Sequence, residues 1–454
     1  MSSPGSEGSW ERVSRSEPWE DDSWDEELYP DETSSSASDG GENGNGDEGE
    51  RVTPLGVGLG TALLLGATVG LGVGVSVAAL ATIASRQIQQ QAPSLLEKLG
   101  FQNLAERRPL NAEKWCEACD GEGRLTDFHG LLVAISKGGI CPSIRVTVWP
   151  FILGLVKPDS TARERARDFD ELRKRYASLV DSCKKLQREL VEGTDHENPK
   201  LLQSEEYKEN RRILNLDLVR TDFASMTLSQ LDGTIDADAV DLGVNDHIES
   251  AEYLSSEQKH YAKYMGKLLL CYSIHDPQTG YCQGMTDLIQ PFAQIFHDQS
   301  ISFWAFEAFM ERARENFMTD ESGIMTRISL IKMVLADVSP DLFSRLNEIG
   351  AESFFFTYRM ILVLLRRELS IEDSMLFWEI LWTEDLFKAQ EQKNDVPEFL
   401  IFSLVALIME KSDEIMGACS SESDVVHMFC NLKINVWHMV EEARFVRNKW
   451  VALA

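Results

Sequence analysis

Two short motifs carry the residues of this chain that are best suited to chemistry. Their polar residues are Asp217, Arg220, Thr221, Tyr281 and Gln283. An arginine guanidinium stays ionised and offers planar, forked donors to phosphate oxygens. A glutamine amide can accept a hydrogen bond from water and donate one to a phosphate at the same time. Brought to one place, the two side chains suit the transfer of a phosphoryl group to water, in which negative charge spreads over the phosphate oxygens.

The two motifs, in this order, resemble the paired fingerprints of the TBC domain, an all-helical module of GTPase-activating proteins for Rab-type small GTPases. The family patterns are written IxxDxxRT and YxQ, and the chain resembles them at residues 214–221 and 281–283. One position departs from the pattern, because the family's isoleucine is replaced by Leu214, an apolar residue of similar size. The polar residues of both patterns are intact.

The resemblance implies a role for each polar residue of the motifs. Arg220 would be an arginine finger that enters the active site of a partner Rab, and Gln283 would position the attacking water. Asp217 would hold the guanidinium ready, and Thr221 would fix the loop. The supporting residues are Asp217, Thr221, Tyr281 and Gly284. The chain would need no cofactor or metal, since the partner binds GTP and Mg²⁺, and it would activate that GTPase without turning over a substrate of its own.

A third stretch, residues 138–154, resembles the early block of the family, especially in the subfamily related to the yeast vacuolar Rab GAP and its plant and animal counterparts. The matching residues include Ser143, Arg145 and Trp149. Ser143 is expected to cap a helix that buries Trp149 and ends at Gly154. Arg145 is expected to be structural and to be held by a carboxylate elsewhere in the chain.

Helical spacing of apolar residues dominates the region that must position these motifs. Stripes with steps of three and four predict helices over residues 160–192 and 303–317. Aromatic-rich helices are expected over residues 354–369 and 375–382. No run alternates as a half-buried strand would. The expected fold class is therefore all-α, with one multi-helix TBC domain over residues 110–454.

Two features could suggest a metal site, and neither has the required spacing. The acidic stretch at residues 222–252 superficially resembles a calcium loop, but the EF-hand spacing and terminal glutamate are missing, so a flexible insertion near the active face is expected. The eight cysteines are scattered singly apart from Cys116 and Cys119, without a second pair at zinc-finger spacing. No metal site is expected, and the cysteine pattern suits a reducing compartment.

Residues 1–51 form an acidic tail that is expected to be disordered. It combines acidic residues with Ser, Gly and Asn runs, which bury too little apolar surface to offset the entropy of ordering. The net charge of the whole chain, −30, argues against a nucleic-acid partner. Trp10 and Val13 resemble the WxxV motif that binds ubiquitin-like autophagy proteins by adding a strand. A plain solvated tail is the alternative.

Residues 52–86 are predicted to include a transmembrane helix. Residues 55–84 contain no charged residue and would form a helix longer than the roughly 30 Å hydrocarbon core of a bilayer. A buried helix of a soluble domain is the alternative. Basic residues follow the segment more often than they precede it, which places the TBC domain in the cytosol, associated with a membrane. Residues 87–109 would then be a linker, and a single span would put Trp10 in the lumen.

Two functions remain open from the sequence. The first is a Rab GTPase-activating protein that acts on a membrane and so regulates vesicle or organelle trafficking. The second is a TBC-type adaptor that binds Rabs or autophagy ubiquitin-like proteins without accelerating hydrolysis. An adaptor has no chemical need for Arg220 and Gln283, so their presence favours the first. A conventional enzyme finds no support, because the sequence has no nucleophile paired with histidine, no metal cluster and no P-loop lysine motif.

Overall fold

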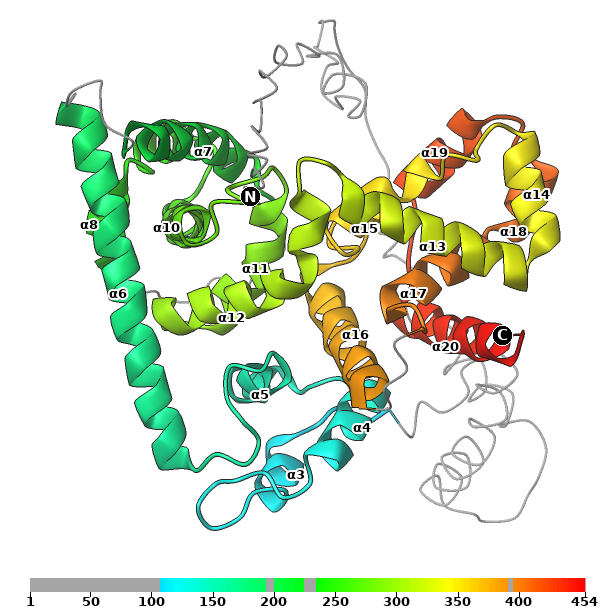
Figure 1. Ribbon diagram of the computed structural model, residues 1–454, viewed down its shortest axis with the longest axis horizontal. Coiled ribbons are helices and arrows are strands. Elements are labelled where there is room, and N and C mark those ends of the chain that lie inside the picture. Colours follow the sequence, from blue (N-terminus) through cyan, green and yellow to red (C-terminus); the bar gives the residue numbers. More distant parts are fainter. Residues whose placement is uncertain (1–106, 193–199, 224–233, 391–394, 454) are drawn as a thin grey trace, which may run out of the picture. The chain divides into compact units, whose positions relative to one another are not determined.

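The computed structural model describes residues 107–192, 200–223, 234–390 and 395–453. In these ranges the chain forms helices α3 to α20, three short 3-10 helices and two isolated β-bridges, and no β-strand (Figure 1). The expected all-α fold is confirmed for this part of the chain. Within the same ranges, no helix combines the length and the apolar character needed to cross a membrane.

Several predictions concern residues outside the described ranges. They are the acidic tail at residues 1–51, the transmembrane segment at 52–86, the motif at Trp10 and Val13, and all but the last residues of the linker at 87–109. These predictions are untested by the structure.

The first helices carry the early block of the sequence. They are α3 (Ala112–Glu117), α4 (Phe128–Gly138), the 3-10 helix η1 (Pro142–Ile144) and α5 (Arg145–Ile152). The prediction that Ser143 caps the helix around Trp149 is wrong, because Ser143 lies inside η1 and α5 begins at Arg145 without a side-chain cap. Trp149 is fully buried, as expected, and the chain leaves α5 through Gly154, whose φ is 84°.

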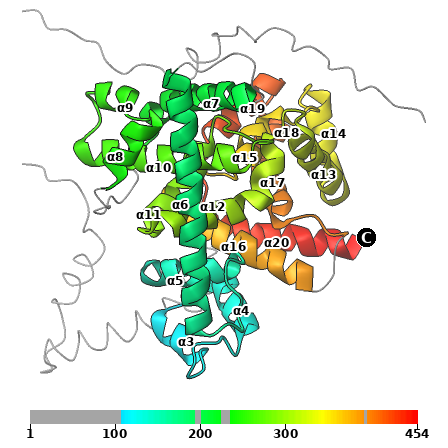
Figure 2. The same ribbon diagram turned by 60° about the vertical axis from the view of Figure 1, so that its left-hand side comes forward.

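The middle helices gather around one buried helix, α10. They are α6 (Ala162–Glu192), α7 (Lys200–Arg220), α8 (Thr234–Leu242), α9 (Asp246–Ser250), α10 (Ser256–His275), α11 (Met285–Ile295) and α12 (Gln299–Ala313). Ser255 and Gln258 form a capping box that starts α10, and residues 261–273 are buried. The long α6 runs along α7, α8, α10 and α12 (Figures 1 and 2), which confirms the helix predicted over residues 160–192.

The acidic stretch between the two motifs forms helices over residues 234–242 and 246–250, so the prediction of a flexible insertion is wrong for these residues. The buried apolar residues on one face of α8 are Ile235, Ala239 and Leu242. Asp238 of the same helix pairs with Lys184 Nζ at 2.6 Å and also with Lys267. Burial works to raise the pKa of Asp238, but the two ammonium groups lower it below its usual value. The charge of Asp238 is therefore neutralised within the fold.

The remaining helices begin at residue 314. They are η2 (Arg314–Phe317), α13 (Ser322–Val338), α14 (Pro340–Glu348), η3 (Phe355–Thr357), α15 (Tyr358–Leu362), α16 (Ile371–Gln390), α17 (Phe399–Glu410), α18 (Ser412–Gly417), α19 (Glu422–Cys430) and α20 (Val436–Leu453). The prediction of one helix over residues 354–369 is wrong outside residues 355–362, because Phe354, Leu364 and Leu365 adopt φ of 60°, 50° and 61° and interrupt it. The helix predicted over residues 375–382 lies within α16 and is confirmed.

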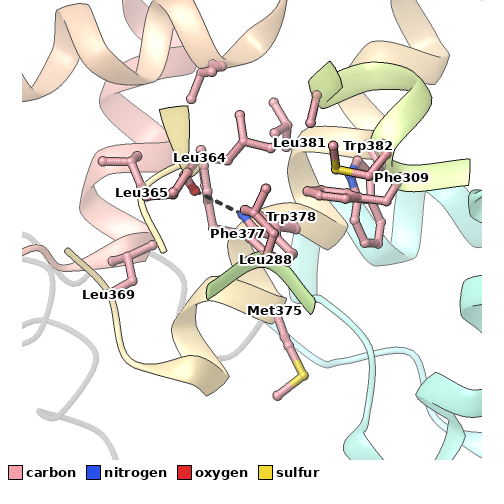
Figure 3. Close-up of a cluster of buried hydrophobic side chains, with 14 of the residues drawn as sticks. Leu288, Phe309, Leu364, Leu365, Leu369, Met375, Phe377, Trp378, Leu381 and Trp382 are labelled. Atoms are coloured by element: carbon pink, nitrogen blue, oxygen red, sulfur yellow. Dashed lines mark hydrogen bonds between the residues drawn. The ribbon is translucent and has the colours of Figure 1, made fainter. Parts of the chain in front are cut away.

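An aromatic cluster fixes α16 against the helices that lead to the motifs. Phe309 of α12 stacks on Trp378 of α16 with ring centroids 4.9 Å apart (Figure 3). Trp149 of α5 meets Trp382 edge to face at 4.9 Å and Phe292 of α11 at 5.3 Å. Such pairs add to the stabilisation that burial alone provides. The cluster thereby holds α11, whose first residue follows the second motif, rigidly in the core.

Candidate functional site

The first motif lies at the carboxyl end of α7. Arg220 is the last residue of the helix, and 53 % of its side chain is exposed. Its Nε donates to the carbonyl oxygen of Leu216 at 3.2 Å, and its Nη2 donates to Asp217 Oδ1 at 3.3 Å. A cation at this position also complements the partial negative charge of the helix end. The guanidinium is therefore held at the surface, where a partner molecule can reach it.

The carboxylate of Asp217 joins the two motifs. Only 8 % of the Asp217 side chain is exposed. While Oδ1 contacts Arg220, Oδ2 accepts from the Tyr281 hydroxyl at 2.6 Å and from the Gly284 backbone nitrogen at 3.2 Å. That nitrogen belongs to the same peptide group as the carbonyl of Gln283. One buried carboxylate thus positions both Arg220 and the backbone that carries Gln283.

Tyr281 and Thr221 secure Asp217 from two sides. Burial, with a smaller effect of the neighbouring Asp217 carboxylate, raises the pKa of Tyr281 well above its usual value. The phenol therefore stays protonated at neutral pH, as a donor to Asp217 must. Thr221 Oγ1 donates to the main-chain oxygen of Asp217 at 3.0 Å, which satisfies a carbonyl in the last turn of α7.

The loop between α10 and α11 presents Gln283 at the surface. At the start of this loop, Asp276 accepts hydrogen bonds from Thr279 Oγ1 at 2.6 Å, Tyr272 Oη at 3.0 Å and Arg314 Nη2 at 3.1 Å. Burial works to raise the pKa of Asp276, but these hydroxyl donors and the Arg314 guanidinium lower it below its usual value. Asp276 is therefore ionised at neutral pH and gives the loop a fixed shape before Gln283 is reached.

Gly284 is the point where the loop enters α11, and its φ of 97° requires a glycine. A Cβ atom at this position would lie 3.2 Å from Val363 Cγ1. Val363 precedes the two left-handed leucines, Leu364 and Leu365, which are buried in the core. Trp378 Nε1 donates to the carbonyl of Leu364 at 3.0 Å (Figure 3). The strained turn at residues 363–365 is thus fixed by the core and packs against the loop of Gln283.

A second tether joins α11 to the chain that follows Arg220. Gln290 of α11 is 1 % exposed, and its Nε2 donates to the carbonyl oxygen of Asp222 at 2.8 Å. Its Oε1 accepts from Arg366 Nη2 at 2.7 Å, and Arg366 Nη1 in turn donates to the carbonyl of Leu369 at 3.1 Å. The segment around Arg220 is therefore fixed before the arginine by Asp217 and after it by Gln290.

The two motifs joined by Asp217 lie in a region of the chain that matches a known protein family. A family model described as the Rab-GTPase-TBC domain matches residues 142–416, more than half of the chain. The chain belongs to this family. Both motifs lie within the matched residues, and further helices lie on both sides of the matched range in the described part of the chain.

Relatives of the TBC domain include a plant protein and a yeast protein. Rab GTPase-activating protein 22 of Arabidopsis thaliana is 24 % identical in an alignment that covers 74 % of this chain and 79 % of that protein. GTPase-activating protein GYP7 of Yarrowia lipolytica is 27 % identical over 338 residues, which cover 74 % of this chain and 43 % of that protein. The chain therefore spans less than half of that yeast relative.

A solved structure shares the TBC fold. The crystal structure of the Ypt/Rab-GAP domain of Gyp1p aligns with a TM-score of 0.54 and 15 % sequence identity, covering 74 % of this chain and 97 % of that chain. At this identity the likeness supports the fold alone.

Arg145 and Trp149 lie in the core of the TBC domain and meet at another carboxylate, Glu379 of α16. Arg145 Nε and Trp149 Nε1 donate to Glu379 Oε1 at 2.7 Å and 3.0 Å, and Arg145 Nη1 also reaches Glu372 at 2.6 Å. Burial raises the pKa of Glu379 to about 7, although Arg145 and Trp149 favour its charged form. The guanidinium of Arg145 is thus engaged by two carboxylates and contributes to packing between α5 and α16.

Three side chains around the motifs escaped the sequence analysis. Gln290 and Arg366 form the second tether, and Asn210 Oδ1 accepts from the Tyr281 backbone nitrogen at 3.3 Å. Each pairing joins residues from different elements, so no local pattern marks it.

Two further predictions concern features outside the two motifs, the absence of a metal site and the motif at Trp10 and Val13. The described residues include no group of His, Cys, Asp and Glu arranged to hold a metal ion, and Cys116 and Cys119 are free thiols there. The predicted motif residues Trp10 and Val13 lie outside the described ranges and stay predictions.

Proposed function

We propose that the protein is a GTPase-activating protein for a Rab-family small GTPase. The observation that carries the proposal is the shared carboxylate of Asp217, which tethers the exposed Arg220 on one oxygen and the loop of the exposed Gln283 on the other. Membership of the TBC family and the names of its plant and yeast relatives support the same activity. The exposed Arg220 and Gln283 side chains have no evident structural purpose, whereas both can donate hydrogen bonds to a phosphate group of a partner.

In the proposed mechanism the two side chains complete the active site of the GTPase. Negative charge spreads over the γ-phosphate oxygens during hydrolysis, and the Arg220 guanidinium would neutralise part of it. The Gln283 amide would accept a hydrogen bond from the attacking water and donate to the phosphate. Because Asp217 positions the Arg220 side chain and the backbone that carries Gln283 before the partner arrives, less ordering remains to be done in the complex. The partner supplies GTP and Mg²⁺, and the TBC domain binds no cofactor and turns over no substrate of its own.

Single-turnover GTP hydrolysis by a panel of Rabs, measured with and without the full chain, tests this proposal. The wild-type chain is expected to accelerate one or a few Rabs. Arg220→Ala should lower that acceleration by about a thousandfold, the usual worth of an arginine finger. Gln283→Ala should lower it by about a hundredfold, as the loss of one positioned donor does in other active sites.

Matched variants separate loss of the two fingers from general damage. Arg212→Ala removes another exposed arginine of α7, which pairs with Glu209 at 2.7 Å. Gln278→Ala removes another exposed glutamine of the same loop. Both should retain wild-type activation. If some Rabs bind the chain and none is accelerated, the non-catalytic adaptor replaces the proposed activity.

We also propose that residues 55–84 anchor the protein in a membrane, with the TBC domain in the cytosol, where it would act on Rabs in vesicle or organelle trafficking. Deletion of residues 52–86 should abolish flotation of the chain with liposomes. A single span would leave Trp10 and Val13 on the far side of the membrane, so binding of autophagy ubiquitin-like proteins there requires both ends of the segment on one side. Protease protection of an amino-terminal tag distinguishes the two topologies.

A further inference from the structure

An aromatic side chain beside Arg220 is both exposed and fixed. Tyr253 is 70 % exposed, yet its hydroxyl donates to the carbonyl oxygen of Val219 at 2.8 Å. Val219 is the residue directly before Arg220. The ring of Tyr253 is therefore anchored to the end of α7 while most of its surface faces solvent.

The turn that carries Tyr253 is well supported. It connects α9 and α10, and Ile248 of α9 is fully buried. The backbone nitrogen of Leu254 donates to the carbonyl of Ala251 at 3.2 Å, and Lys259 Nζ donates to the carbonyl of Glu249 at 2.8 Å. The capping box of α10 begins one residue after Leu254. The acidic stretch between the motifs thus folds into a support that places an aromatic ring at the end of the α7 helix.

A second apolar side chain is exposed near the guanidinium. Leu216 lies one helical turn before Arg220 and is 40 % exposed. Its carbonyl oxygen accepts the hydrogen bond from Arg220 Nε, so the arginine side chain folds back toward this turn. Two exposed apolar side chains, Leu216 and Tyr253, therefore accompany Arg220 at the surface.

We propose that Tyr253 is a binding contact for the Rab GTPase and contributes to the choice among Rabs. This inference rests on the proposed function. A specific interface covers about 800 Å² of each partner, which extends far beyond a single residue. If Arg220 enters the nucleotide site of a GTPase, the Tyr253 ring, which is hydrogen-bonded to Val219, lies inside the interface with that GTPase. Tyrosine is enriched among residues that dominate interfaces, because its rigid ring loses little entropy on binding.

The chemistry of the ring defines the partner surface that it fits. Because its hydroxyl is already bonded to Val219, Tyr253 offers an apolar ring face to the partner. We infer that it packs on an apolar patch next to the nucleotide site of the GTPase. Rabs that carry a charged residue at this position would bind less tightly, because the charged group would lose its hydrating water molecules and the Tyr253 ring offers it no hydrogen bond or ion pair in return.

The same single-turnover assay, run over a range of concentrations of the full chain, tests the inference. For the Rab accelerated most, it yields the rate at saturation and the concentration that gives half of this rate. Tyr253→Ala should raise the half-saturating concentration about tenfold, as loss of an interface tyrosine commonly does. The saturating rate should stay within about twofold of wild type, since the variant leaves both fingers intact.

Two further variants separate binding from support of the helix end. Tyr253→Phe keeps the ring and loses the bond to Val219, so it should retain most of the affinity. Phe445→Ala removes another exposed aromatic ring, 58 % exposed on α20, and should behave as wild type. If Tyr253 served only to hold the helix end, Tyr253→Phe and Tyr253→Ala would both lower the saturating rate.

The possible outcomes are distinct. A raised half-saturating concentration for Tyr253→Ala alone supports the inference. Activation by the wild type together with an unchanged half-saturating concentration for Tyr253→Ala overturns it and leaves the proposed function standing. A lowered saturating rate in both tyrosine variants also overturns it. If the wild type accelerates no Rab, the proposed function and the inference fall together.

Discussion

Tyr281 and Asp217, 64 positions apart in the chain, share a hydrogen bond of 2.6 Å in the interior of the domain. The bond joins the two motifs into one structural unit. The Tyr281 ring is buried, and its hydroxyl can reach the carboxylate only when the loop before α11 lies against the end of α7. Correct packing of these two elements is therefore what brings Arg220 and Gln283 to the same surface.

Loss of this bond should weaken activation more than binding. Tyr281→Phe removes the hydroxyl and leaves Asp217 Oδ2 with the Gly284 nitrogen alone. The expected cost in stability is about 1–2 kcal/mol, because a buried acceptor loses its strongest donor. The rate of GTP hydrolysis at saturating concentration should fall about tenfold, since about 1.4 kcal/mol of lost transition-state stabilisation corresponds to that factor. Thermal unfolding and single-turnover hydrolysis measure the two effects. An unchanged saturating rate would contradict the positioning role of Tyr281.

Gly284→Ala should disturb the loop through two effects that can be separated. At φ of 97° an alanine is strained by about 1–2 kcal/mol, and its Cβ would press on Val363 Cγ1. Gly154→Ala is the matched control, because Gly154 has φ of 84° and no atom within 4 Å of the added Cβ. Both variants should lose stability in thermal unfolding, and only Gly284→Ala should lose activation of the Rab. Equal activation by the two would mean that the contact with Val363 is unimportant.

The sequence predicted those features that depend on residue type and local spacing. The charges of α6 alternate with Phe169, Leu172, Tyr176, Leu179 and Cys183 at helical steps. The observed helix follows that stripe. α8 has a similar stripe, but its aspartates led to the prediction of a flexible insertion, because only the fold reveals Lys184 and Lys267 opposite Asp238.

Other features could not be predicted because tertiary contacts create them. The sequence has no glycine or proline at Leu364 and Leu365 that would predict the end of a helix there. Their left-handed conformations persist because the surrounding core and the hydrogen bond from Trp378 hold them. The pairings of Gln290 with Asp222 and of Tyr253 with Val219 join elements that only folding brings together. The motif residues were identifiable from the sequence, whereas their supports were not.

Gln290→Glu is expected to lower catalysis while keeping the fold. The carboxylate of the new glutamate would still accept a hydrogen bond from Arg366. It could no longer donate one to the carbonyl oxygen of Asp222, and its negative charge would repel that oxygen. The chain after Arg220 would lose its tether, so the saturating rate should fall about tenfold with little change in half-saturating concentration. Gln390→Glu, at an exposed position at the end of α16, is the control and should retain activity. A wild-type rate for Gln290→Glu would show that the Asp217 tether suffices.

Glu384→Gln should destabilise the domain in a pH-dependent way. Glu384 is 5 % exposed, and its carboxylate pairs with Arg444 at 2.6 Å and Arg447 at 2.7 Å, which ties α16 to α20. Burial works to raise the pKa of Glu384, but the two guanidinium groups lower it below the usual 4.5. Breaking such a buried pair costs about 3–5 kcal/mol at neutral pH.

The sign of the pH dependence follows from the lowered pKa of Glu384. At pH values between the pKa of Glu384 in the folded protein and 4.5, its pKa in the unfolded chain, the unfolded chain binds more protons than the folded one. The stabilisation by Glu384 is therefore fully present above about pH 4.5 and is lost as the pH falls through the pKa of the folded state. The gap between the unfolding temperatures of wild type and Glu384→Gln should therefore stay constant from pH 8 to 5.5 and shrink below 4.5. Glu414→Gln breaks an exposed pair with Lys411 at 2.8 Å and should change stability by less than about 1 kcal/mol. A gap for Glu384→Gln that widens on acidification would contradict the assignment of Glu384 as an ionised link between α16 and α20.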